Sequence, residues 1–218
     1  MFAETSSTLG ARAPNLAARA EDRFIDLLRH GETLGGARFR GALDDRLTET
    51  GVAQMQAAVA GRTWDRLVTS PARRCAAFAE HLAYRLDRPL EVWPELGERD
   101  FGEWEGRTAA EIPLADLTRF WSDPVAYTPP GAEPFSALEV RALDAWRRLQ
   151  DLAFTRLLVI THGGIIRILL GAVLGMPANR LLMLEVPHAC LTRVRLPAPC
   201  GQPSLVFHRG GPGCGEPS

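Results

Sequence analysis

Apolar residues follow two different spacings along this chain. Short continuous runs bounded by polar or turn residues are typical of buried strands, and four stand out: 23–28, 67–69, 90–93 and 157–161. Longer segments suit helices: 51–61, 72–86, 136–153 and 163–174. Three further strands are predicted near 182–186, 191–196 and 205–208. Strands and helices therefore alternate for most of the length.

This alternation predicts an α/β fold: a three-layer α/β/α sandwich with a mostly parallel central sheet. Ligands bind such sheets at the carboxyl ends of the strands. Two histidines occupy such positions, since His30 follows the run 23–28 and His162 follows the run 157–161. We therefore expect both histidines to belong to one site.

One region departs from the alternating pattern. Residues 95–134 are rich in glycine, proline, tryptophan and acidic residues, with short helical pieces near 109–112 and 114–121. We interpret them as an insertion packed over the sheet edge. Residues 1–22 and 210–218 show no clear period and are expected to be flexible tails, which leaves one domain at 23–209.

Composition removes several classes of function. The 218 residues are 46% hydrophobic and 23% charged with a formal net charge of −1, as in a globular protein with no global field for nucleic acid or membrane. Neither a membrane-length apolar run nor a signal peptide is visible, and the four cysteines lack metal-ligand spacing. We expect a cytoplasmic protein with reduced thiols.

The basic residues are unusual, because all 25 are arginine and none is lysine. A Walker-type phosphate loop and a lysine Schiff base are therefore excluded. Any anion must be bound by arginine, histidine or backbone amides.

Four segments carry candidate chemistry: LRHGET at 28–33, SPARR at 70–74, the acidic and aromatic stretch 95–106, and THGG at 161–164. Arginine offers a planar fork of donors that matches phosphate oxygens, and neutral imidazole is a nucleophile near pH 7. A carboxylic acid beside such a site can protonate a leaving oxygen and then activate water. Together these residue types favour phosphoryl chemistry.

Taken in this order, RHGET, SPxxR, E-x-x-x-G-x-W-E-G and THGG resemble the histidine phosphatase, or phosphoglycerate mutase-like, superfamily over residues 23–209. The resemblance implies that His30 is the nucleophile that becomes phosphorylated. It also implies that Arg29, Arg74 and His162 bind the phosphate, and that Glu98 is the proton donor. No metal or cofactor is needed for this chemistry.

Within the superfamily, the chain is most similar to the bacterial alpha-ribazole phosphatases. This similarity implies removal of the 5′-phosphate of alpha-ribazole phosphate during assembly of the cobalamin nucleotide loop, with a small phosphorylated metabolite as the partner. The further candidates for substrate contact are Thr33, Gly36, Arg38, Arg40 and Gly163.

Three positions leave questions open. Many relatives carry asparagine where this chain has Gly36, so one donor is lost, to be replaced by Arg38, Arg40 or a backbone amide. The stretch 129–134 lacks the serine of its counterparts. His188 either faces the site or bonds the backbone at a strand end.

Competing functions are a broad-specificity histidine phosphatase, a phosphoglycerate mutase-like enzyme and a non-catalytic module that binds phosphorylated ligands. Mutases usually carry a longer insertion, and non-catalytic relatives typically lack the nucleophile, a pocket arginine or the acid. All of those residues are present here.

Overall fold

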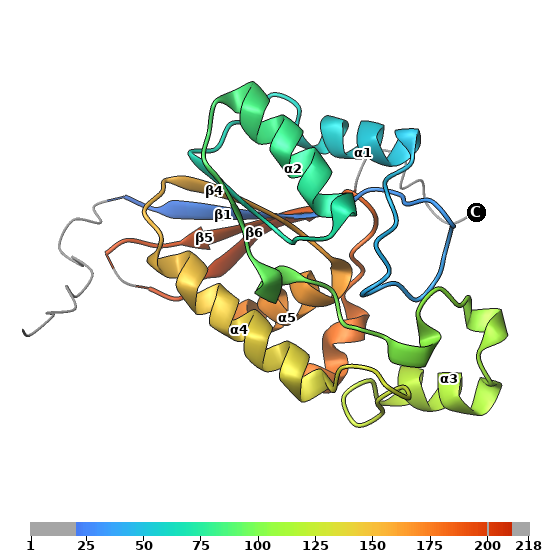
Figure 1. Cartoon of the computed structure of the whole chain (residues 1–218). Coiled ribbons are helices and arrows are strands. Elements are labelled where there is room, and N and C mark those ends of the chain that lie inside the picture. The colour runs from blue at the N-terminus through green and yellow to red at the C-terminus, as the bar shows by residue number, and fades with distance from the viewer. Residues whose placement is uncertain (1–20, 200, 211–218) are drawn as a thin grey trace, which may run out of the picture.

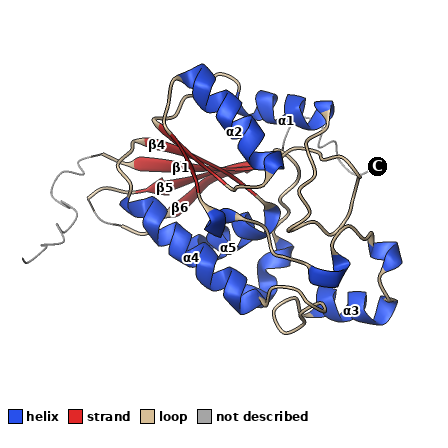
Figure 2. Ribbon diagram, viewed as in Figure 1, coloured by secondary structure: helices blue, strands red, loops and turns tan. Residues whose placement is uncertain are grey.

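The computed structural model describes residues 21–199 and 201–210. It contains one six-stranded sheet with helices on both faces (Figures 1 and 2). The strands are β1 (Arg23–Arg29), β2 (Arg66–Thr69), β3 (Leu90–Val92), β4 (Arg156–Thr161), β5 (Leu191–Leu196) and β6 (Ser204–Arg209). The α-helices are α1 (Glu49–Val59), α2 (Arg73–Leu86), α3 (Leu114–Ser122), α4 (Phe135–Asp151) and α5 (Gly163–Leu174). The described residues also form four short 3-10 helices, η2 (Pro94–Leu96), η3 (Gly102–Trp104), η4 (Ala109–Glu111) and η5 (Ala178–Met183).

The sheet order explains how the site forms. The strands lie in the order β3-β2-β4-β1-β5-β6. Strands β3, β2, β4 and β1 are mutually parallel, β5 is antiparallel to β1, and β6 is antiparallel to β5. In the parallel pair of β1 and β4, Arg29 lies opposite Thr161. A histidine directly follows each of these two residues in the chain. His30 and His162 therefore lie next to each other at the same edge of the sheet. The predicted α/β sandwich with a mostly parallel sheet is confirmed.

Alternation of side chains along the central strands fills two cores. Ile25 and Leu27 of β1 face the core that contains α4 and α5, whereas Leu28 faces the core that contains α1 and α2. Figure 1 shows these helix pairs on opposite faces of the sheet. Because both faces are buried, the central strands read as continuous apolar runs in the sequence.

One predicted strand is wrong. Residues 182–186 form no strand: they include the end of η5 and an irregular segment. The backbone carbonyls here accept hydrogen bonds from arginine side chains instead of a neighbouring strand. Leu184 O accepts from Arg167 Nε at 2.9 Å, and Val186 O accepts from Arg29 Nη1 at 2.5 Å. A short apolar run alone does not distinguish these arrangements.

Residues 95–134, which we call the cap segment, form their own small aromatic core. Trp104, Ile112 and Phe120 are buried there, and Phe39 and Phe101 pack against them. Figure 1 shows α3 beyond the carboxyl-terminal ends of the parallel strands. The insertion that was expected over a sheet edge thus lies at this end of the sheet. Residues of the cap segment therefore line a cavity together with His30.

The predicted tails fall mostly outside the described residues, namely 1–20 and 211–218. Within the described part, Asp22 Oδ1 accepts a hydrogen bond from Ala198 N at 3.1 Å. No helix in that part is long and apolar enough to cross a membrane.

Candidate active site

His30 is held in one orientation directly after β1. Its Nδ1 lies 2.8 Å from Gly31 O, and because a carbonyl can only accept, Nδ1 must carry the proton. The other ring nitrogen, Nε2, then holds a lone pair and has no partner among the described residues. Burial lowers the pKa of His30 well below its usual value, and Arg29 lowers it further. His30 is therefore a neutral imidazole with a free nucleophilic nitrogen.

The glycine after His30 is required by packing. A Cβ on Gly31 would lie 2.1 Å from Gly51 O at the start of α1. This contact brings α1 against the loop that carries the histidine.

His162 is the N-cap residue of α5 and is completely buried. Arg74 Nε donates to His162 Nδ1 at 3.3 Å, so Nε2 carries the proton and donates to Ser70 Oγ at 2.7 Å. The rings of His30 and His162 lie edge to face, with centroids 5.3 Å apart. A phosphate contact by His162 would have to replace one of its two present partners.

Arg74 lies in the first turn of α2 and is also completely buried. Its Nη1 donates to Leu43 O at 2.8 Å and its Nη2 to Gly41 O at 3.0 Å. Two of its five N–H groups remain for a ligand. Glu105 of the cap segment holds the same loop, because its carboxylate accepts from the amides of Gly41 and Leu43.

Glu98 reaches the site from the start of the cap segment. Its carboxylate accepts from Arg99 N and, at the beginning of α5, from Gly164 N, both at 3.0 Å. A Cβ on Gly164 would lie 2.3 Å from Glu98 Oε1, so only glycine leaves room for the carboxylate. Glu98 and His30 line the same cavity. A carboxylic acid and a candidate nucleophile are therefore both accessible from this cavity.

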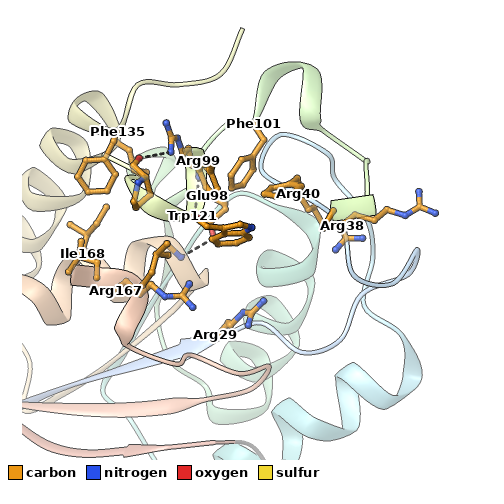
Figure 3. A pocket seen from close by; sticks show the side chains of 18 of the residues that line it. Arg29, Arg38, Arg40, Glu98, Arg99, Phe101, Trp121, Phe135, Arg167 and Ile168 are labelled. Atoms are coloured by element: carbon orange, nitrogen blue, oxygen red, sulfur yellow. Dashed lines mark hydrogen bonds between the residues drawn. The ribbon is translucent and has the colours of Figure 1, made fainter. Parts of the chain in front are cut away.

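The cavity of about 380 Å³ extends from His30 into the cap segment. Its polar end holds His30, Arg29 and Glu98, while Phe39, Phe101, Phe120, Trp121 and Phe135 form its aromatic wall. Figure 3 shows the Trp121 ring of the cap segment at the same opening as Arg29. A phosphate bound at the polar end would place its organic group against aromatic side chains.

The remaining sequence candidates have different environments. Thr33 is buried and pairs with Leu47 in a β-bridge, and Gly36 is exposed with φ +72°. Arg38 and Arg40 line the cavity, although Arg40 is held by an ion pair with Asp45. Gly163 is buried beneath Arg29 and Arg167.

The structure places two more residues, Arg167 and His188, at the site. Arg167 lines the cavity and was not identified from the sequence. The one sequence feature that could have indicated Arg167 is its position. It follows Gly163 by four residues, so the two lie on the same face of the helix. His188 faces the site: its ring centroid lies 5.7 Å from that of His30. This resolves the open question of its position.

The lowered histidine pKa values predict that acid destabilises the fold. The pKa values of His30 and His162 lie well below the usual range, chiefly through burial, and burial and Arg29 lower that of His188 to about 4. The unfolded chain binds protons that the folded chain excludes, so the free energy of unfolding should fall as pH drops below about 6.5, by at most ~1.4 kcal/mol per pH unit per histidine.

Urea unfolding at pH 7.5, 6.5 and 5.5 measures this effect. His188→Gln should flatten the dependence relative to the parent chain, whereas His81→Gln, at an exposed position of α2, serves as the matched control. A free energy of unfolding that stays constant from pH 7.5 to 5.5 would refute the burial argument.

Comparison with known proteins identifies several phosphatases that are similar to this chain. The adenosylcobalamin/alpha-ribazole phosphatase of Escherichia coli is 27% identical over 177 residues, covering 77% of this chain and 87% of the relative. The glucosyl-3-phosphoglycerate phosphatase of Mycolicibacterium vanbaalenii is 30% identical over 172 residues, covering 72% and 76%. A solved structure of a putative alpha-ribazole-5′-P phosphatase from Escherichia coli superposes with a TM-score of 0.76 at 24% identity, covering 86% of this chain and 96% of that one.

The family model described as "Histidine phosphatase superfamily (branch 1)" matches residues 25–205. The match spans β1 to β6 and includes every residue placed around the cavity above. This chain belongs to the histidine phosphatase superfamily.

Proposed function

We propose that the chain hydrolyses phosphomonoesters through a phosphohistidine formed on His30. The observation that carries the proposal is the state of this imidazole. Its Nδ1 is protonated and bonded to Gly31 O, and its Nε2, beside Arg29, has no partner among the residues that the structure describes. Membership of the superfamily supports phosphatase activity. The same geometry argues against a non-catalytic module, which has no need of a free nucleophilic nitrogen beside an acid.

The reaction has two balanced steps. In the first, His30 Nε2 attacks phosphorus, the bond to the leaving oxygen breaks, and Glu98 gives its proton to that oxygen. In the second, the Glu98 carboxylate takes a proton from water, the resulting oxygen attacks phosphorus, and the phosphorus–nitrogen bond breaks. Inorganic phosphate leaves, and His30 and Glu98 return to their starting states.

Arg29, Arg74 and His162 are proposed to surround the phosphate. Phosphoryl transfer depends mainly on positioning and on neutralising charge at the non-bridging oxygens. Arg29 lies next to the nucleophile in the chain, and Arg74 contributes the charge of a completely buried guanidinium. His162 aligns Arg74 through its Nδ1.

We infer that the substrate is alpha-ribazole 5′-phosphate, in the assembly of the cobalamin nucleotide loop. Two observations support this choice over a broad-specificity enzyme or a mutase-like one. Relatives with alpha-ribazole phosphatase activity in their names match 77% of the chain. The aromatic wall beside His30 suits a leaving group with an aromatic base.

A substrate panel tests this inference. Phosphate release is measured for alpha-ribazole 5′-phosphate, glucosyl-3-phosphoglycerate, 3-phosphoglycerate, nucleoside monophosphates and p-nitrophenyl phosphate. We expect kcat/KM for alpha-ribazole 5′-phosphate to exceed the others by about a hundredfold, or roughly 2.7 kcal/mol of transition-state binding. Similar values across the panel would reject this substrate and retain a broad-specificity phosphatase.

A further inference from the structure

Arg167 presents a guanidinium to the polar end of the cavity. It lies on α5 one turn after Gly163, and side chains of a helix lean towards its N-terminus. Its Nε donates to Leu184 O at 2.9 Å, which fixes the direction of the group. Among the described residues, no acceptor pairs with its two terminal nitrogens. Figure 3 shows Arg167 and Arg29 entering the same opening.

The two guanidiniums flank a single point. A Cβ on Gly163 would lie 3.1 Å from Arg167 Nη1 and 3.6 Å from Arg29 Nε. Neither arginine forms an ion pair with a carboxylate within the described residues. Burial lowers the pKa of Arg29, and the charge of Arg167 lowers it further, opposed by Glu98. Two close cations without a paired anion repel each other, and a bound dianion would relieve that repulsion.

Two other arginines that border the cavity, Arg38 and Arg40, are less suited to bind an anion there. Arg40 is already bonded to Asp45 and to the carbonyls of Leu34 and Gly36. Arg38 is exposed at the rim of the cavity. Arg167 is half-buried and oriented by its bond to Leu184 O, and its terminal nitrogens have no partner within the described part of the chain.

We propose that Arg167 binds the phosphoryl group that is transferred to His30, acting together with Arg29. This inference rests on the proposed function for its catalytic meaning, but its contact with phosphate can be measured without turnover. Two guanidiniums at one phosphate share its non-bridging oxygens and neutralise its charge.

Calorimetric titration with inorganic phosphate tests the contact. Arg167→Met should weaken phosphate binding about 10- to 100-fold, as expected for loss of a charge-assisted hydrogen bond. Arg147→Met is the matched control, because it removes one exposed arginine from α4, and it should stay within about twofold of the parent chain. If folded Arg167→Met binds phosphate as tightly as the parent chain, the proposal is overturned. This holds even if the variant hydrolyses some substrates more slowly, because such a loss would place Arg167 at the leaving group and not at the phosphate.

A second variant covers the risk that Arg167→Met disturbs folding by losing the bond to Leu184. Gly163→Ala keeps Arg167 and its bond but places a methyl group between the two guanidiniums. It should also weaken phosphate binding, with a melting temperature near that of the parent chain, and parent-like binding would count against the proposal. If the chain binds phosphate through Arg167 but hydrolyses no phosphomonoester, the proposed function is rejected and the inference about Arg167 stands.

Discussion

Replacing His30 with glutamine is expected to lower kcat for every phosphomonoester by about 10⁴-fold or more, because the reaction loses its nucleophile. Glutamine can still donate to Gly31 O, so the loop after β1 keeps its hydrogen bond. Phosphate release under saturating substrate measures the loss. His81→Gln, at an exposed position of α2, is the matched control and should retain full activity.

The chemical step can be separated from folding. Urea unfolding and far-ultraviolet circular dichroism should show His30→Gln as folded as the parent chain, since within residues 21–199 and 201–210 the side chain makes only the one hydrogen bond to Gly31. A folded His30→Gln chain with parent-like kcat would remove the phosphohistidine from the mechanism.

Glu98→Gln is expected to produce the second-largest loss, about 10²- to 10⁴-fold, for substrates whose leaving group is an alkoxide. Glutamine can occupy the same place beside Gly164 N but cannot transfer a proton. The first step with p-nitrophenyl phosphate should be much less affected, because p-nitrophenolate leaves without a proton. Pre-steady-state release of p-nitrophenol, compared with release of the ribazole alcohol, measures this difference.

Two comparisons sharpen the assignment of Glu98. Glu103→Gln alters an exposed carboxylate of the same cap segment and should change neither step. Gly164→Ala leaves Glu98 in the chain but displaces its carboxylate, because the added Cβ would lie 2.3 Å from Oε1. It should reproduce the dependence on the leaving group. An equal loss for both kinds of substrate would contradict a role as general acid.

Much of the fold was predictable because its central strands are buried on both faces. Continuous apolar runs located β1 and β4, and the position of a histidine after each run predicted a shared edge of the sheet. The predicted strand 182–186 failed because its carbonyls serve arginine side chains rather than a neighbouring strand. Hydrophobic spacing carries no information about such side-chain bonds.

The site was predictable where residues follow one another in the chain and less so where they meet through packing. His30 and Arg29 lie in one motif, but Arg167 enters the site only because α5 turns it back towards Gly163. Similarly, His188 reaches His30 because Ala189 N donates to His30 O at 3.1 Å. An arginine on a helix is usually a solvated charge, so the sequence alone gave no reason to single out Arg167.

The most direct test is to trap the phosphorylated chain. Glu98→Gln is mixed with p-nitrophenyl phosphate labelled in the phosphoryl group and quenched within milliseconds to seconds, because its second step lacks the general base and the intermediate should accumulate. We predict a covalent label on the chain that is stable in alkali, labile in acid and mapped by mass spectrometry to His30, with none on the His30→Gln, Glu98→Gln double variant. Turnover without a covalent label, or a label on another residue, would contradict the account.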